Sequence, residues 1–170
     1  MEKYYGMNIR KRLQNPYLIF VLGCLLGSLV FVCIYGLAVV NVTNVAWLTD
    51  SSQAEGLWDL TQHYLGWVFY RKSPWHFPLG LVEGIYSQPV SIVYTDFALL
   101  FKILSPLLPA NFQYFGLFEL LSYALMGGFG TLFVRAFSKR SQICLLSSLF
   151  FVLSPVMLKR TFYHTALSAH

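Results

Sequence analysis

A charge-free apolar run near the N-terminus strongly limits what this chain can fold into. It extends from Tyr17 to Val40, about 24 residues, and follows a segment, residues 1–16, that carries four basic side chains. At a rise of about 1.5 Å per residue, a helix of this length crosses a hydrocarbon core roughly 30 Å thick with some tilt. The apolar region of a cleaved signal peptide is shorter, roughly 7–15 residues. We therefore predict an uncleaved transmembrane helix over residues 17–40 with a cytoplasmic N-terminus.

Two further apolar runs, residues 112–137 and 143–158, are also predicted to be transmembrane helices. The chain is 56% hydrophobic and only 11% charged, a composition that excludes an ordinary soluble domain. The basic loop between the two runs, residues 138–142 with the flanking Arg135, should remain in the cytoplasm because short Lys- and Arg-rich loops do so. We predict an all-α, polytopic transmembrane protein in which residues 41–111 and 159–170 face the exterior.

The segment Ile92–Leu108 is apolar enough to count as another span. It contains Asp96 and Lys102 and is interrupted by proline. A crossing here would place Arg135 and its basic neighbours outside, against the charge rule. We therefore predict a re-entrant or interfacial helix on the outer membrane surface, within a large first outer loop.

Acidic residues gather in that outer loop. Five of the seven acidic residues and two of the four histidines lie in residues 41–96. The segment 56–70 predicts an amphipathic helix, after which two prolines in residues 73–80 enforce a loop. One helical face would present Asp59, Gln62, His63 and Gly66, and the membrane-facing side would carry Leu57, Leu60, Tyr64, Trp67 and Val68.

The arrangement resembles the GT-C superfamily of membrane glycosyltransferases. The resemblance is carried by Asp59-Leu-Thr-Gln-His-Tyr-Leu-Gly-Trp-Val-Phe-Tyr-Arg71, Trp75-His-Phe-Pro-Leu-Gly80, Ser91-Ile-Val-Tyr-Thr-Asp96 and Tyr163-His-Thr-Ala-Leu-Ser-Ala-His170. These segments look like the opening part of a bacterial family of multi-spanning proteins, described mainly as a domain of unknown function, with GT-C-like organisation. The resemblance covers nearly all of the chain after residue 40. It implies the bacterial inner membrane, and the chain is expected to be the N-terminal part of a longer protein and inactive alone.

The resemblance implies transfer of a sugar from a polyprenyl-phosphate lipid to an acceptor on the outer face. An outer-loop aspartate would act as the base or position the acceptor, with Asp59 as first choice and Asp96 and Asp50 as alternatives. Asp59 and Asp96 together could also hold a divalent cation. The expected substrate-binding residues are the polar neighbours Gln62 and His63 and the groups suited to a lipid phosphate, Arg71, Lys72, Arg160 and His164.

Several residues have a second interpretation on sequence grounds. Asp59 is otherwise a solvated residue of a polar helix face, and Asp50 is otherwise an N-cap. Arg160 and His164 are otherwise interfacial anchors beside the third span. Glu119, inside a predicted span, faces the protein interior or reaches toward the membrane interface, and a buried position in a polar interior is the usual expectation. Glycines at 127, 128 and 130 predict a close-packing helix surface.

Two other functions remain open from the sequence. One is a transporter or flippase-like subunit that uses Glu119, Asp96 and Lys102 as intramembrane polar groups. The other is a non-catalytic scaffold for envelope assembly. Binding of nucleic acid is not expected, because most of the formal charge of +5 comes from the two basic clusters predicted to be cytoplasmic.

Overall fold

The computed structural model describes residues 15–49, 57–83, 87–91 and 99–165. These residues are mostly helical and include three helices long and apolar enough to span a membrane, Pro16–Tyr35, Phe115–Arg135 and Ser141–Arg160. Within the described residues, the number of candidate spans equals the predicted number. The chain forms two compact units: residues 1–38 with 117–159, here called the helical unit, and residues 39–116 with 160–170, here called the loop unit.

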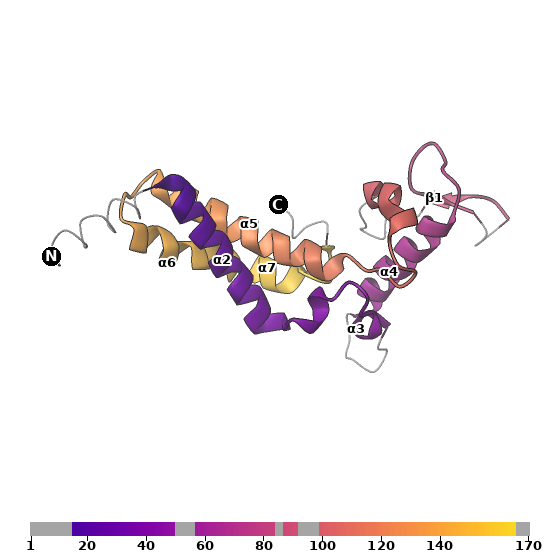
Figure 1. Cartoon of the computed structure of the whole chain (residues 1–170), viewed down its shortest axis with the longest axis horizontal. Helices are drawn as coiled ribbons and strands as arrows, with labels where there is room; N and C mark the ends of the chain where they lie inside the picture. Colours follow the sequence, from indigo (N-terminus) through magenta and orange to yellow (C-terminus); the bar gives the residue numbers. More distant parts are fainter. Residues whose placement is uncertain (1–14, 50–56, 84–86, 92–98, 166–170) are drawn as a thin grey trace. The chain divides into compact units, whose positions relative to one another are not determined.

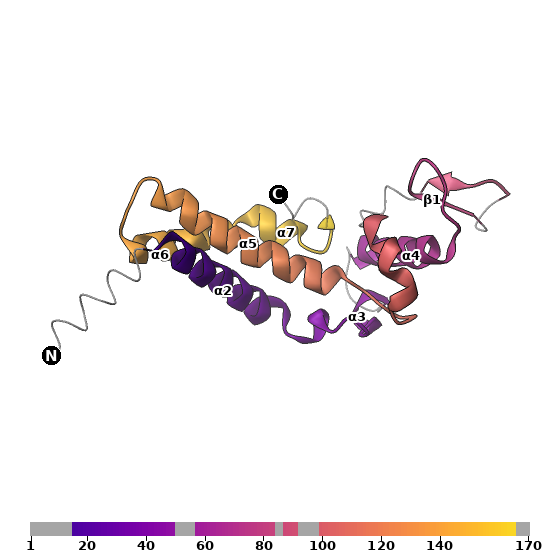
Figure 2. The ribbon, with the colours of Figure 1, turned by 45° about the horizontal axis from the view of Figure 1, so that its top comes forward.

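The helical unit contains α2 (Pro16–Tyr35), most of α5 (Phe115–Arg135), α6 (Ser141–Val152) and most of α7 (Pro155–Arg160). Asn15 caps α2 by accepting a hydrogen bond from the Tyr17 amide at 2.9 Å. Gly36, with a φ of 78°, ends α2 before the predicted boundary at residue 40. Residues 38–40 form the short 3₁₀ helix η1 instead. Figures 1 and 2 both show α2 and α5 side by side.

Glycines allow α2 and α5 to approach at backbone distance. A Cβ at Gly23 would lie 2.6 Å from the carbonyl oxygen of Gly127, and a Cβ at Gly27 would overlap the carbonyl oxygen of Tyr123. Thr131 Oγ1 donates to the carbonyl oxygen of Gly128 within α5 at 2.6 Å and also lies 3.3 Å from the carbonyl oxygen of Ile19 in α2. The predicted close-packing surface is confirmed. Small residues serve this purpose where van der Waals packing holds membrane helices together.

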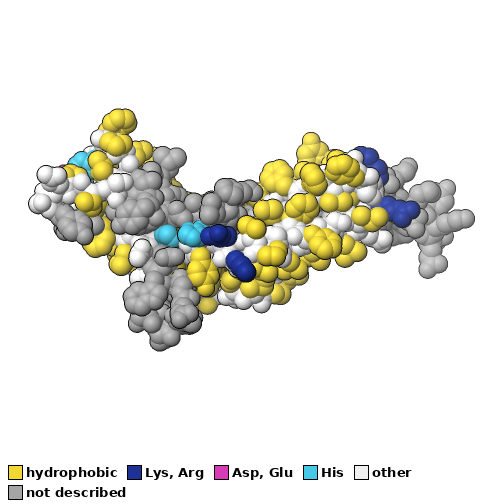
Figure 3. Space-filling model, turned by 180° about the vertical axis from the view of Figure 1, so that it is seen from behind, with side chains coloured by type: hydrophobic (Ala, Val, Ile, Leu, Met, Phe, Trp, Pro, Cys, Tyr) yellow, Lys and Arg dark blue, Asp and Glu magenta, His cyan; other side chains and the backbone are white. Residues whose placement is uncertain are grey.

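The outward faces of these helices are apolar. Leu25, Leu29, Leu121, Phe129 and Phe150 are all more than half exposed, and Figure 3 shows such side chains over the helical surface. Polar groups lie inside: Glu119 is fully buried, as the sequence predicted, and the hydroxyl of Tyr35 lies 3.2 Å from that of Tyr123. An apolar exterior around polar interior groups is the arrangement that suits lipid.

The loop unit contains α3 (Ala46–Thr49), α4 (Leu57–Lys72), β1 (Leu81–Val82), β2 (Val90–Ser91) and the 3₁₀ helix η3 (Leu99–Leu107). The strands pair antiparallel, with Leu81 opposite Ser91 and Val82 opposite Val90. The chain is mostly helical, as an all-α class requires, and this ladder of two short strands is an addition that the sequence did not predict. Two-residue strands are too short to produce the alternating pattern by which strands are recognised.

Helix α4 buries its apolar side within the protein. Leu60 and Trp67 are fully buried, Tyr70 is nearly so, and the Trp67 indole donates to the carbonyl oxygen of Phe112 at 3.0 Å. Leu60, Tyr64 and Trp67 were expected to face the membrane, and that expectation is wrong. The loop unit supplies its own apolar partners for this side. Among the side chains of α4 that the structure describes, the exposed large apolar ones are Leu65 and Phe69.

A buried glutamine joins the two chain segments that lead into and out of the loop unit. The Gln113 amide donates to the carbonyl oxygens of Val39 at 2.9 Å and Asn41 at 2.8 Å, and its Oε1 accepts from the Gly116 amide at 3.2 Å. Asn111 adds a 2.8 Å hydrogen bond to the carbonyl oxygen of Thr43. Residues 39–43 and 111–116 are therefore held together.

Candidate functional site

The predicted acids of the candidate site are Asp59, Asp96 and Asp50. Asp50 and Asp96 lie outside the described residues, and for Asp59 only its place in α4 is described. Asp59 lies four residues before His63, a spacing that puts two residues on one helical face. The described part of the candidate site centres on His63 and the residues around it.

His63 is buried, with 5% of its surface exposed, and its Nε2 lies 3.3 Å from the carbonyl oxygen of Tyr163. A carbonyl oxygen only accepts hydrogen bonds, so Nε2 must carry the proton of this contact. In the neutral ring, Nδ1 then holds the lone pair. Among the described residues nothing hydrogen-bonds to Nδ1. The geometry makes Nδ1 a buried hydrogen-bond acceptor.

The segment that contacts His63 carries two further predicted site residues. The amides of Tyr163 and His164 both donate to the carbonyl oxygen of Arg160, at 3.1 and 2.8 Å. Phe162 packs its ring edge-on against Trp47, with ring centres 5.0 Å apart. This segment is therefore fixed to the loop unit, and the structure brings His63, Arg160 and His164 into one region. Gln62, also predicted, is exposed on α4 beside His63.

Arg71 lies apart from His63, and its side chain has a structural role. Its guanidinium donates to Ser105 Oγ at 2.7 Å and to four carbonyl oxygens, those of Ser105, Leu108, Pro109 and Ala110, at 2.9–3.3 Å. The Ser105 carbonyl lies in the last turn of η3 and the other three follow the end of that helix, where fewer helical N–H groups remain to satisfy carbonyl oxygens. Burial lowers the pKa of Arg71. Because Arg71 comes twelve residues after Asp59, the two are separated by about 18 Å along the axis of α4.

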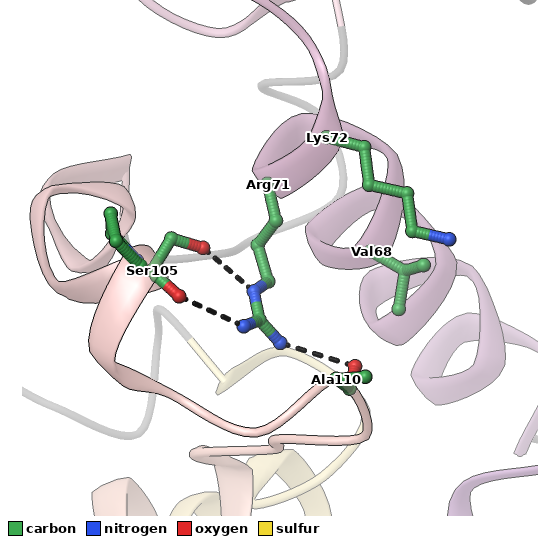
Figure 4. Close-up of a pocket in the computed structure, with 6 residues that line it drawn as sticks. Val68, Arg71, Lys72, Ser105 and Ala110 are labelled. Carbon is green, nitrogen blue, oxygen red and sulfur yellow. Dashed lines mark hydrogen bonds between the residues drawn. The ribbon is translucent and has the colours of Figure 1, made fainter.

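Lys72 and Arg71 line a cavity of about 360 Å³. The other lining residues are Val68, Ser105, Pro106 and Ala110, so the walls come from α4 and from the end of η3 with the residues after it. Figure 4 shows Arg71 reaching across to Ser105 and Ala110, while the Lys72 side chain extends beside Val68. Arg71 and Lys72 thus form a second location, apart from His63 and Arg160.

A buried lysine holds the loop that follows α4. Lys102 is 4% exposed and its Nζ donates to the carbonyl oxygen of Pro74 at 3.0 Å. The same Nζ lies 4.1 Å from the ring centre of Tyr70 and 4.8 Å from that of Trp75, distances at which a cation is attracted to an aromatic face. Sequence reasoning gave Lys102 a role only in the transporter hypothesis.

The environment of Lys102 predicts a pH dependence. Burial lowers its pKa below the ordinary value of 10.5. Between the lowered value and 10.5 the unfolded chain binds more protons at this residue than the folded chain, so the free energy of unfolding rises with pH. We expect the stability of the wild type relative to Lys102→Met to increase over this alkaline range, in thermal unfolding of the detergent-solubilised protein. A constant difference between the two proteins would contradict the prediction.

Three contributors to these sites were missed by sequence reasoning: the Tyr163 carbonyl, the Ser105 hydroxyl and the aromatic faces around Lys102. Each depends on a contact between distant segments, and the local sequence carries no signal for it. No three His, Cys, Asp or Glu side chains come together within the described part of the chain in a way that could hold a metal ion. The divalent-cation site predicted from the carboxylates of Asp59 and Asp96 involves side chains outside the described residues.

The described residues define a mostly helical protein with three candidate membrane spans and a loop unit formed by residues 39–116 and 160–170. The chain belongs to the family described as "Domain of unknown function (DUF6311)", whose family model matches residues 24–170. Neither the curated proteins nor the solved structures contain a significant match to the chain.

Proposed function

We propose that this chain is part of a GT-C-like membrane glycosyltransferase of the bacterial inner membrane. It would transfer a sugar from a polyprenyl-phosphate donor to an acceptor hydroxyl on the outer face. The observation that carries the proposal is the buried His63, whose Nε2 is occupied by the Tyr163 carbonyl so that Nδ1 accepts. Asp59 lies one helical turn earlier. A carboxylate and an acceptor imidazole one turn apart form a pair suited to take or hold the proton of a hydroxyl.

In the proposed reaction, the acceptor hydroxyl loses its proton to Asp59, while His63 Nδ1 accepts a hydrogen bond that orients a substrate hydroxyl. The hydroxyl oxygen forms a bond to the anomeric carbon, and the bond from that carbon to the phosphate oxygen breaks. The polyprenyl phosphate leaves with the electron pair. A nearby cation would stabilise the negative charge on the leaving phosphate.

Arg160 suits that role better than Arg71. The anomeric carbon and the phosphorus atom are separated by only one bridging oxygen, whereas Arg71 lies about 18 Å along α4 from Asp59. Arg160 is exposed and belongs to the segment that contacts His63. His164 belongs to the same segment.

The test is sugar transfer from radiolabelled polyprenyl-phosphate donors in membranes that contain the full-length protein. We expect Asp59→Asn to lower transfer by roughly 10²- to 10⁴-fold, the usual contribution of general-base catalysis. His63→Gln should lower it by about tenfold or more, because it removes a buried hydrogen-bond acceptor. His76→Gln is the matched control, since His76 is also in the loop unit but pairs with Glu83 at 3.1 Å.

Unchanged transfer in Asp59→Asn at equal expression would remove Asp59 as the base. The absence of transfer with every donor would favour the second candidate, a transporter or flippase-like subunit. One observation supports that alternative, because Glu119 is a fully buried carboxylic acid within a candidate span. Transport of a labelled lipid-linked sugar that depends on Glu119 would establish it.

A further inference from the structure

We propose that the cavity between α4 and the end of η3 is a binding site for a phosphate anion, separate from the transfer site. The cavity has a volume of about 360 Å³, which lies within the range of small-ligand sites, roughly 300–1,000 Å³. It lies at the C-terminal end of α4, about 12 Å along the helix from His63. The proposal does not depend on the glycosyltransferase assignment.

The charge of the cavity favours an anion. Arg71 and Lys72 contribute two positive charges, and no acidic residue is among the described residues that line it. Arg71 is fixed by its hydrogen bonds to Ser105 and to the carbonyls after η3, so its charge stays in place when a ligand enters. A fixed cation beside partly apolar walls acts more strongly than one in open water, since screening by solvent is weaker there.

Two side chains can donate hydrogen bonds to the ligand directly. Ser105 Oγ accepts from Arg71 Nε at 2.7 Å, which leaves the serine hydroxyl proton available for donation. Lys72 is exposed, and its flexible stem lets the ammonium swing from the position seen in Figure 4 towards the cavity. Val68, Pro106 and Ala110 form an apolar wall that can receive the organic part of a phosphate ester.

The shared chemistry of the ligand is a phosphate group, which a free anion or a lipid headgroup could supply. The full chain in detergent would be titrated with inorganic phosphate by calorimetry. In a second arm, short-chain phosphatidic acid would be added and bound lipid counted by native mass spectrometry, with phosphate-free diacylglycerol as the comparison. Binding of inorganic phosphate would indicate a free anion, and binding of phosphatidic acid alone would indicate a headgroup.

Binding of inorganic phosphate or of phosphatidic acid supports the proposed site only if that binding depends on Lys72. We expect Lys72→Gln to weaken binding by about tenfold or more, Lys72→Glu to weaken it further and Lys72→Arg to retain it. Lys139→Gln, which alters an exposed lysine outside the loop unit, should leave binding unchanged. Failure of both probes to bind, or equal binding by wild type, Lys72→Gln and Lys72→Glu, would overturn the proposal. Asp59→Asn should bind like wild type, so this result is independent of sugar transfer.

Discussion

Gly27→Ala is expected to lower the free energy of unfolding of the helical unit by about 3 kcal/mol or more. The added Cβ would overlap the carbonyl oxygen of Tyr123 and lie 2.8 Å from its carbonyl carbon. Both are backbone atoms, which cannot rotate away as a side chain can. The helices α2 and α5 must therefore separate and lose packing along their contact, and overpacking of this kind usually costs about 1–3 kcal/mol or more.

The matched control for Gly27→Ala is Gly130→Ala, on α5. Its added Cβ would lie 3.0 Å from a ring carbon of Phe151, a side chain that can shift. Since alanine favours a helix over glycine by up to about 1 kcal/mol, this variant should be close to neutral. Unfolding in mixed detergent micelles, followed by circular dichroism, would compare the two. Equal stability of both variants would show that the α2–α5 contact is not tight at Gly27.

Arg71→Lys is expected to destabilise the loop unit by about 3 kcal/mol or more, despite keeping the positive charge. A guanidinium presents five donors in a planar fork, whereas an ammonium is a point charge with three. Lysine therefore cannot satisfy the Ser105 hydroxyl together with the carbonyls after η3, to which Arg71 donates at 2.7–3.3 Å. Hydrogen bonds to charged groups contribute about 1.5–3 kcal/mol each, and several are lost at once.

The neighbouring Lys72→Gln is the control for Arg71→Lys, because Lys72 is exposed and should change stability by less than about 0.5 kcal/mol. Protection of residues 99–110 from hydrogen exchange would report on the loss of this contact directly. Normal protection in Arg71→Lys would mean that charge alone holds the end of η3, contrary to our expectation.

Local sequence patterns predicted the helices well. The length of the charge-free apolar run predicted α2, and hydropathy predicted α5 and the combined segment of α6 and α7. A membrane span is a long, continuous stretch of apolar residues and is therefore easy to recognise in a sequence. Helical spacing predicted a helix over residues 56–70, and α4 runs from Leu57 to Lys72, two residues beyond the predicted end and just before the proline-containing loop. The glycines of α5 predicted close packing, since their small size has few other uses in the middle of an apolar helix.

The candidate site could be predicted only in part, because its geometry depends on contacts between distant segments. The sequence identified His63 as a candidate because it is a histidine on the polar face of a helix. The choice of Nε2 as the protonated nitrogen follows from the contact with the Tyr163 carbonyl, and no sequence periodicity links these two residues. Arg71 was expected to bind phosphate directly, whereas the structure shows its donors occupied by carbonyls from residues 105–110. The apolar side of α4 was assigned to the membrane because one helix does not reveal what covers it.

The contact between His63 and Tyr163 also has a consequence for biogenesis. Its two partners are 100 residues apart, and both α5 and α6 are synthesised between them. A chain stalled before residue 163 has no carbonyl to fix the histidine ring, so Nδ1 and Nε2 can exchange the proton freely. The buried acceptor is therefore completed late, after the ribosome has produced all three candidate spans. Partly inserted chains would carry the α4 sequence with a histidine ring that no backbone carbonyl holds in place.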